Sequence, residues 1–241
     1  MRVLAIDSSA VSAGAAVVED GKILGRFFVN TGYTHSQTLL PMIENVLAVT
    51  GRTVADMDLI AVSNGPGSFT GVRIGVATAK GLAFKNKIPC AGISTLEAMA
   101  YNFLNENAIV YALMDARRMQ VYNAVFRVCG GVVTRLCEDR AAAVEEIGND
   151  LAQYKEERII FVGDGAALCY NILKDACPGI VLAAENIRYQ DAYGVAMAAL
   201  QAKAVSAEDL TPSYLRLAQA QRELKLKLEK KEEKKNDSVG I

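Results

Sequence analysis

The sequence predicts an α/β protein of two lobes that share one order of elements. Two apolar runs that end in aspartate, "VLAID" and "IVYALMD", open the two halves of the chain. Each run is followed by two alternating segments around a turn, which is the pattern of a β-hairpin. Helical and strand-like segments then alternate in both halves. The order strand, strand, strand, helix, strand, helix, strand, helix therefore occurs twice, as expected for a duplicated unit.

The first unit begins with a strand ending at Asp7 and a hairpin around Asp20 and Gly21. A helix is predicted over 36–50, a strand over 58–63, a helix over 70–86, a strand over 88–94 and a last helix in "STLEAMAYNFL". These elements define a predicted N-terminal lobe, residues 1–105.

The second unit begins with a strand ending at Asp115 and a hairpin around Gly130 and Gly131. A helix over about 144–154 comes next, and then "RIIFVGDGA", "ALCYNILKDA", "GIVLA" and "DAYGVAMAALQAKA" read as strand, helix, strand and helix. The predicted C-terminal lobe is residues 106–217, and a charged tail follows over 218–241.

Composition limits the classes of function. Hydrophobic residues make up 51% of the 241 positions, which is enough for a sizeable core. The net charge of −1 predicts little long-range attraction to nucleic acid or anionic membranes. No apolar run is long enough to span a bilayer, so no membrane contact is expected. The five cysteines form no C-x-x-C pair and lie among apolar residues, as expected for reduced thiols in a cytoplasmic protein.

The glycine-rich stretch "SNGPGSFTGVRIG", residues 63–75, lies where many proteins bind phosphate, between a strand and a helix. Its spacing fits neither a P-loop, which needs a lysine, nor the G-x-G-x-x-G dinucleotide fingerprint. His35 is the single histidine and cannot build a zinc or iron site alone. We therefore predict no metal site, no catalytic residue and no cofactor, and leave open a nucleotide at a subunit interface.

The repeated plan resembles the actin/Hsp70/sugar-kinase folds, which are duplicated ribonuclease H-like units facing each other across a cleft. The resemblance places a set of residues in that cleft: Asp7, Ser8, Asp115, Arg117, Gly163 and Gly165. One interpretation is a nucleotide cleft with a metal-binding Asp7. The other is a pair of strand-end caps with an Asp–Arg contact between the lobes, and the missing histidines and phosphate loops favour it. The fold alone does not choose between them.

Small residues recur every four positions on the helix predicted over 70–86, at Gly71, Gly75, Ala79 and Ala83. Each interior glycine costs about 1 kcal/mol of helix propensity relative to alanine, so two on one stripe need a reason. The usual reason is close approach of another backbone. That backbone can belong to a partner protein or to the neighbouring helix of the same lobe, and the residues leave both interpretations open.

Seven motifs together resemble the bacterial TsaB family over residues 1–217: "VLAIDSS", "HSQTLLPMI", "GPGSFTGVRIG", "STLEAMA", "MDARRMQVY", "VGDGA" and "LTPSYLR". The resemblance implies a non-catalytic dimerisation subunit of the complex that makes threonylcarbamoyladenosine in tRNA. The implied partners are TsaD, which carries the metal and transfers the threonylcarbamoyl group, and the ATPase TsaE. Alone, such a chain is expected to form a homodimer, and it meets tRNA through the complex.

The resemblance also implies that the two helices of the N-terminal lobe pack against those of TsaD. The corresponding interface residues here are Leu39, Leu40, Ile43, Leu47, Gly71, Val72, Gly75, Ala79 and Ala83. Gln37 departs from the glutamate that the family often has after "HS", which leaves any polar contact at that position open. Older descriptions call such proteins glycoproteases, and the single histidine argues against that activity.

Two other functions compete with the scaffold prediction. A phosphotransferase or ATPase of the same fold would use the cleft between the lobes. A direct RNA-binding module is disfavoured by the net charge and by the lack of a clustered basic stripe outside the tail. In residues 222–235, eleven of fourteen residues are charged. Such a run is usually a solvated helix or a disordered end. A weak contact between the tail and RNA is the functional alternative.

Overall fold

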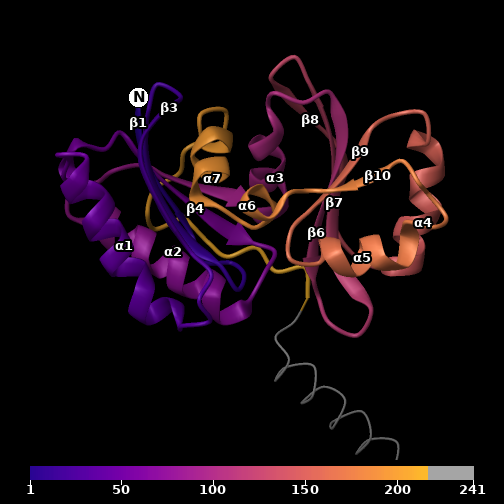
Figure 1. The fold of residues 1–241 in the computed structure, drawn as a ribbon. Helices are drawn as coiled ribbons and strands as arrows, with labels where there is room; N and C mark the ends of the chain where they lie inside the picture. The colour runs from indigo at the N-terminus through magenta and orange to yellow at the C-terminus, as the bar shows by residue number, and fades with distance from the viewer. Residues whose placement is uncertain (217–241) are drawn as a thin grey trace, which may run out of the picture.

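The computed structural model describes residues 1–216 and shows two lobes side by side (Figure 1). The charged tail predicted for 218–241 lies outside the described residues. Every helix within residues 1–216 falls short of the length and apolar character that crossing a membrane requires.

The N-terminal lobe contains a five-stranded sheet with the order β3-β2-β1-β4-β5. The first three strands are antiparallel, and β4 and β5 continue the sheet in parallel from β1. Its elements are β1 (Arg2–Asp7), β2 (Ala13–Glu19), β3 (Lys22–Val29), α1 (His35–Val49), η1 (Val54–Asp56), β4 (Leu59–Gly65), α2 (Phe69–Phe84), β5 (Cys90–Ser94), α3 (Thr95–Ala100) and η2 (Tyr101–Phe103).

The C-terminal half repeats this sheet with the order β10-β9-β6-β7-β8. Its elements are β6 (Ala108–Asp115), β7 (Gln120–Cys129), β8 (Val132–Ala143), α4 (Val144–Leu151), η3 (Ala152–Tyr154), β9 (Ile159–Val162), α5 (Ala166–Leu173), β10 (Ile180–Leu182), α6 (Glu185–Arg188) and α7 (Ala192–Ala199). The predicted duplicated unit is confirmed, with α6 as an added turn of helix.

Local chemistry explains several boundaries. Asp20 and Gly21 both have positive φ, at 50° and 79°, as the tight hairpin turn between β2 and β3 requires. Helix α2 begins at a serine cap, because the Ser68 side chain accepts a hydrogen bond from the Gly71 amide. Ser94 caps α3 in the same way through the Glu97 amide. The helices predicted over 36–50 and 70–86 correspond to α1 and α2, and their bounds differ by one or two residues at each end.

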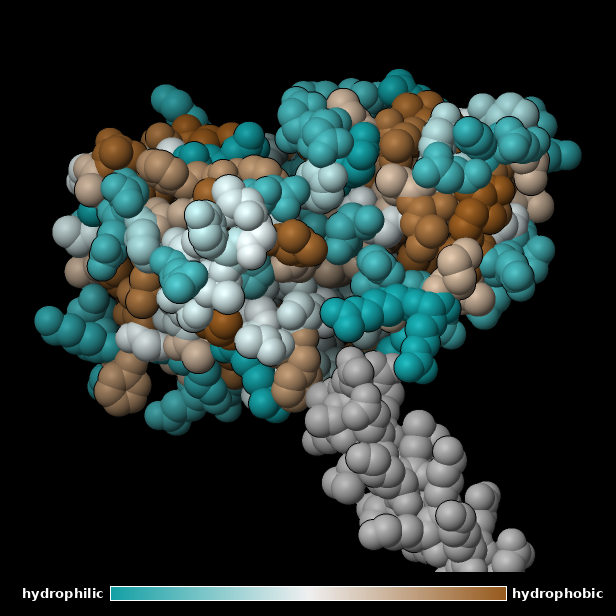
Figure 2. Space-filling view, turned by 60° about the horizontal axis from the view of Figure 1, so that its bottom comes forward, coloured by the Kyte–Doolittle hydropathy of each residue, from teal (hydrophilic) through white to brown (hydrophobic). Residues whose placement is uncertain are grey.

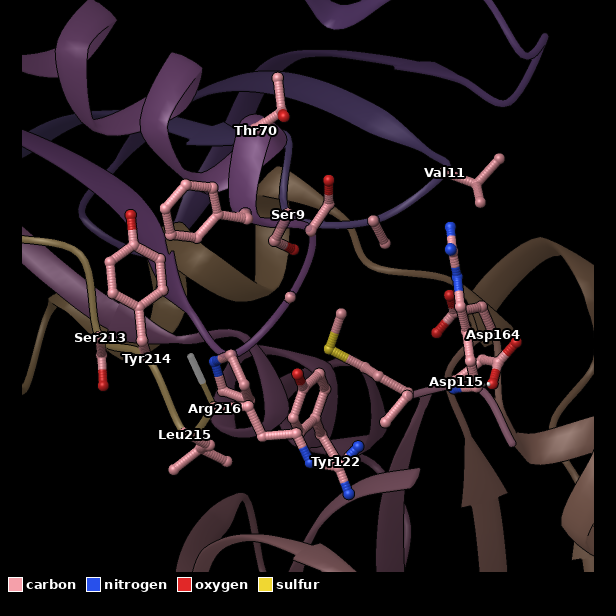
Figure 3. Close-up of a pocket in the computed structure, with 18 residues that line it drawn as sticks. Ser9, Val11, Thr70, Asp115, Tyr122, Asp164, Ser213, Tyr214, Leu215 and Arg216 are labelled. Carbon is pink, nitrogen blue, oxygen red and sulfur yellow. Dashed lines mark hydrogen bonds between the residues drawn. The ribbon is translucent and has the colours of Figure 1, made fainter. Parts of the chain in front are cut away.

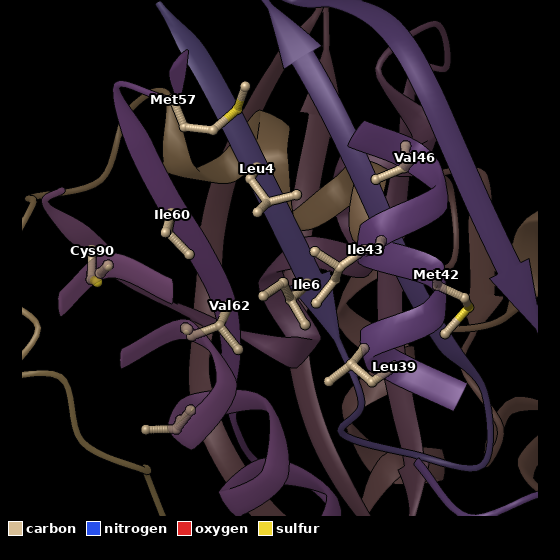
Figure 4. Packing of buried hydrophobic residues seen from close by; sticks show 14 of the residues in the cluster. Leu4, Ile6, Leu39, Met42, Ile43, Val46, Met57, Ile60, Val62 and Cys90 are labelled. Atoms are coloured by element: carbon tan, nitrogen blue, oxygen red, sulfur yellow. The ribbon is translucent and has the colours of Figure 1, made fainter. Parts of the chain in front are cut away.

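The first sheet is covered by helices on both faces. Helices α1 and α2 cover one face, where their side chains pack against Leu4, Ile6 and Ile60 of the strands (Figure 4). Helix α7 covers the other face against Val3, Ala5 and Ala61. Apolar residues therefore alternate between two cores along β1, which explains why the whole strand is apolar rather than half polar.

The last helix of each half packs across the lobe boundary. Leu96 and Met99 of α3 join the core under β6 and β7 of the second sheet, whereas α7 belongs to the first lobe. The two helices also pack against each other and lie between the two sheets (Figure 1). The segment after α7 stays on the first lobe, where Val205 pairs with Cys90 and Leu210 enters the core. The structure thus differs from the division at residue 105, because α3 and residues 192–210 each complete the core of the opposite half.

The contact between α3 and α7 leaves no room for a side chain at Gly194. A Cβ atom there would lie 2.0 Å from the Ala98 carbonyl oxygen. We expect Gly194→Ala to lower the free energy of unfolding by about 1–3 kcal/mol through overpacking, measured by urea denaturation. Gly179→Ala is the matched control, since a Cβ there meets nothing within 4 Å. Equal stability of the two variants would contradict this account of the interlobe packing.

Candidate functional site

A cavity of about 530 Å³ lies between the two lobes (Figure 3). The N-terminal lobe contributes the loop after β1 and the start of α2, the second half contributes the ends of β6 and β9, and residues 213–216 close one side. Its lining residues are Ser9, Ala10, Val11, Pro66, Gly67, Ser68, Phe69, Thr70, Met114, Asp115, Ala116, Arg117, Tyr122, Asp164, Ser213, Tyr214, Leu215 and Arg216. The loop after Asp7 and the turn after Asp115 therefore line the same cavity.

Asp7 does not line this cavity, because it is fully buried beneath the loop. Its Oδ1 accepts hydrogen bonds from the Ser9 amide at 2.8 Å and the Ser9 hydroxyl at 2.7 Å. Its Oδ2 accepts one from the Ser63 hydroxyl at 2.6 Å. Burial raises the pKa of Asp7 above its ordinary value, and these hydrogen bonds oppose the shift. Asp7 thus acts as a strand-end cap, and the Asp–Arg contact considered for it does not form.

The glycines of the 63–75 stretch are explained by close backbone contacts inside the first lobe. A Cβ atom at Gly67 would lie 2.2 Å from the Ser9 carbonyl oxygen, and one at Gly71 would lie 2.1 Å from that of Ser8. At Gly75 the obstacle is the Ser8 hydroxyl, at 2.7 Å. These glycines therefore let the turn and α2 lie directly against the end of β1.

The second half repeats this arrangement at Gly163 and Gly165. A Cβ at Gly163 would lie 2.1 Å from the Leu113 carbonyl oxygen, and one at Gly165 would lie 2.9 Å from the Asp115 amide nitrogen. Gly163 also has φ of 106°, which side chains rarely tolerate. Both predicted cleft glycines thus support the end of β6 without lining the cavity.

The predicted partner-facing stripe requires a correction. Gly71, Gly75, Ala79 and Ala83, together with Val72, are all buried against the lobe's own sheet and β1 loop. Leu39, Ile43 and Leu47 of α1 also point into that core (Figure 4 labels the first two). Of the nine predicted interface residues, Leu40 alone has an exposed side chain, at 49%. The physical reason is that the sheet needs an apolar cover, and this stripe provides it.

The outward face of these two helices carries other residues. Ala77 and Gly81 of α2 are exposed, and a Cβ at Gly81 would meet nothing within 4 Å. Phe84 at the end of α2 is 74% exposed and Val49 at the end of α1 is 70% exposed. Leu40 is exposed on the opposite flank of α1 from Val49, and we term the surface that these five residues border the outer face of α1 and α2. Sequence periodicity missed Gly81 because small residues recur every four positions on both sides of α2.

Residues 211–216 form a strap that runs from the first lobe to the second. The Ser213 amide donates to the Asn64 carbonyl at 2.7 Å, and Gly65 is a glycine because a Cβ there would lie 2.1 Å from the Ser213 oxygen. The Tyr214 ring stacks on Phe69 with centroids 4.8 Å apart. Arg216 then donates to the Gln120 side chain at the start of β7. The strap thus forms one wall of the cavity (Figure 3).

Several aromatic and charged side chains around the cavity were not predicted, in addition to Asp115 and Arg117, which were. Tyr122, Tyr214 and Arg216 line it, and so does Asp164. Asp164 accepts a hydrogen bond from Gln190 at 3.0 Å, and burial raises the pKa of this carboxyl. The motif "LTPSYLR" contains the strap residues, but nothing in it indicated that Tyr214 contacts Phe69 or that Arg216 contacts Gln120. Within residues 1–216, no three His, Cys, Asp or Glu side chains gather in a way that could hold a metal ion.

Comparison with known proteins identifies the family. Residues 30–236 match the family model described as "TsaD: tRNA N6-adenosine threonylcarbamoyltransferase". The chain is 32% identical over 222 residues to the tRNA threonylcarbamoyladenosine biosynthesis protein TsaB of Escherichia coli, covering 90% of this chain and 95% of that protein. The chain belongs to the TsaB family. The TsaB of Bacillus subtilis is 29% identical over 225 residues, which cover 92% of this chain and 96% of that protein.

The TsaB fold is also found among solved structures. YeaZ from Pseudomonas aeruginosa superposes with a TM-score of 0.72 at 24% identity, over 89% of this chain and 99% of that chain. At this identity the match concerns the fold alone. The predicted two-lobed fold and the predicted membership of the TsaB family, whose named members are tRNA threonylcarbamoyladenosine biosynthesis proteins, are both confirmed.

Two glycines on one helix test the corrected assignment of faces. Gly71→Ala should lower the free energy of unfolding by at least about 1–3 kcal/mol, because the Ser8 carbonyl occupies the space. Gly81→Ala should raise it by up to about 1 kcal/mol, because only helix propensity changes there. Thermal and urea denaturation measure both effects. A stable Gly71→Ala protein would mean that α2 does not lie against β1 as described.

Proposed function

We propose that this TsaB-family protein is a non-catalytic subunit that binds TsaD and supports threonylcarbamoyladenosine formation on tRNA. Family membership over nearly the whole chain carries the proposal, because the E. coli and B. subtilis relatives are named for this biosynthesis. TsaE is the further protein partner, and tRNA is reached within the assembled complex. These partners place the protein in the cytoplasm.

The outer face of α1 and α2 is the surface proposed for TsaD. Leu40, Val49 and Phe84 expose apolar side chains on it, and Ala77 and Gly81 leave the α2 backbone accessible. Small residues allow two helices to approach closely, and exposed apolar side chains gain free energy when covered. The same features suit a second copy of this chain, so we propose that self-association uses the same face when TsaD is absent.

The buried Asp7 supports a non-catalytic role. Its two oxygens are occupied by Ser9 and Ser63, and the side chain is removed from the cavity. A metal ligand or general base would need an oxygen within reach of a bound substrate. The structure therefore favours a capping role over the competing phosphotransferase or ATPase.

Reconstitution tests the proposed function directly. The chain is mixed with TsaD, TsaE, tRNA and threonylcarbamoyl-adenylate, and modified adenosine is measured with and without it. Strong dependence of modification on this chain is the expected result. Modification that proceeds equally well without it would overturn the proposal, and ATP hydrolysis by the isolated chain would favour the enzyme alternative.

Blocking the outer face should separate binding from folding. Gly81→Leu adds a large side chain where the isolated protein has open space, so the fold and thermal stability should be retained. Overpacking at an interface costs about 1–3 kcal/mol, so affinity for TsaD should fall by about tenfold or more. Size-exclusion chromatography and titration calorimetry measure this. Gly179→Leu on the other lobe is the control, and equal behaviour of the two variants would remove this surface from the proposal.

Replacing Asp7 tests its capping role. Because burial raises the pKa of Asp7, its carboxyl favours folding below the unfolded pKa, and this contribution is lost as pH rises through the folded value. Asp7→Asn removes the titration, so the variant should remain folded at neutral pH. Modification by the assembled complex should stay within about tenfold, a change of under about 1.4 kcal/mol. A loss of several orders of magnitude in an intact complex would mean that Asp7 takes part in chemistry.

A further inference from the structure

The turn between β6 and β7 has an unusual backbone. Arg117, Arg118 and Met119 have φ of 64°, 55° and 58°, so three consecutive residues other than glycine lie in the left-handed region. Side chains disfavour this region, and glycine or asparagine usually occupies it. The corresponding turn between β1 and β2, within the described residues, contains no positive φ. The turn therefore carries three side chains in a backbone conformation that costs free energy, which points to a function for those side chains.

Hydrogen bonds hold the turn in this conformation. The Arg117 amide donates to Asp115 Oδ1 at 2.7 Å, and the Ala116 amide donates to the Gln120 carbonyl at 2.9 Å. The Gln120 amide donates back to the Arg117 carbonyl at 3.2 Å. Both arginine side chains are exposed, and Arg117 lines the cavity.

Two further arginines reach the same cavity region from distant parts of the chain. Arg216 of the strap lies 5.7 Å from the centre of the Tyr122 ring, and Arg73 of α2 lies 3.8 Å over Phe69 and donates to the Tyr214 hydroxyl. Hydrophilic side chains gather between the lobes in the space-filling view (Figure 2). We term Arg73, Arg117, Arg118 and Arg216 the cationic rim.

The positive charges of the cationic rim are not neutralised by neighbouring carboxylates. Within residues 1–216, none of its four guanidinium groups forms an ion pair, whereas Arg127 pairs with Glu157 and Arg158 pairs with Glu106. Of the two acids in the cavity, Asp115 is engaged by the turn and Asp164 is mostly buried. Guanidinium groups without an ion pair bind phosphate or carboxylate, because their planar N–H pairs match the oxygens of both.

The interior of the cavity is poorly suited to a small phosphate ligand. Phosphate loops use free backbone N–H groups, but the Ser68 amide donates to the Ser9 carbonyl and the Gly71 amide to the Ser68 hydroxyl. In the other lobe, the amides of Gly163 and Gly165 donate to the carbonyls of Arg188 and Leu113. The rim side chains supply the cationic phosphate donors, and they are available to an extended backbone outside the cavity.

We propose that the cationic rim contacts the phosphate backbone of tRNA, with Arg117 and Arg118 as its central pair. This inference rests on the proposed function, which brings tRNA to the complex. Such contacts position the nucleic acid without reading its sequence, and they weaken with salt because bound counterions are released. The exposed Tyr214 and the half-buried Tyr122 lie beside the rim, and aromatic rings in that position offer stacking to unpaired bases.

The test replaces both arginines by glycine, which suits the left-handed turn. Arg117→Gly/Arg118→Gly should keep thermal stability at or above that of the original protein while binding tRNA about tenfold more weakly at low salt. The slope of log affinity against log salt should fall by about two, one for each phosphate contact. Fluorescence anisotropy with unmodified tRNA measures both quantities, for the chain alone and for its complex with TsaD.

The control is Arg127→Ala/Arg158→Ala, which makes the same change in net charge at two paired arginines of the same lobe. It should leave the salt slope unchanged. Four results would overturn the proposal: an unaltered affinity and slope in the glycine variant, an equal loss in the control, a loss of ATP or AMP binding with tRNA binding intact, or failure of the glycine variant to bind TsaD. If the original chain fails to bind TsaD, that result counts against the proposed function alone. The tRNA titration of the isolated chain still tests whether the arginines bind phosphate.

Discussion

In each lobe, the turn after the fourth strand lies so close to the end of the first strand that no side chain fits between the two backbones. Gly67 and Gly71 meet the carbonyls of Ser9 and Ser8, and Gly163 meets that of Leu113. This close approach sets the position of the loop after β1 and of the turn after β6, which together line the cavity. It also sets the rotation of α2 about its axis, because the side carrying Gly71 must face β1.

The rotation of α2 about its axis determines which of its residues are exposed on the protein surface. With Gly71, Gly75, Ala79 and Ala83 turned inward, Ala77 and Gly81 are turned outward. The outer face of α1 and α2 is therefore shallow and backbone-rich, and exposed apolar side chains lie at its ends. The surface proposed for TsaD is thus accessible without any rearrangement of the core.

Several polar groups beside the cavity between the lobes form hydrogen bonds within the protein itself. Asp7 caps β1, and the amides of the glycine turns are taken by internal carbonyls. The strap from Thr211 to Arg216 adds a wall that ties the first lobe to β7 of the second. What remains exposed is a rim of arginines, which extends from Arg117 and Arg118 of the β6–β7 turn to Arg73 on the outward side of α2.

The amino-acid sequence alone determined the duplicated order of strands and helices, the hairpins, the absence of a phosphate-loop spacing and the family. These properties depend on local periodicity, turn residues and motifs, all of which are written within a few residues of one another. Tertiary structure alone decided which small residues of α2 are buried. Small residues lie four apart on both sides of this helix, at 71, 75, 79 and 83 and again at 77 and 81. It also decided that α3 and α7 cross between the lobes, that Arg117 and Arg216 line one cavity, and that Arg73 packs on its Phe69 ring. Contacts between residues so far apart in the chain depend on how the two sheets pack, and no local pattern records that.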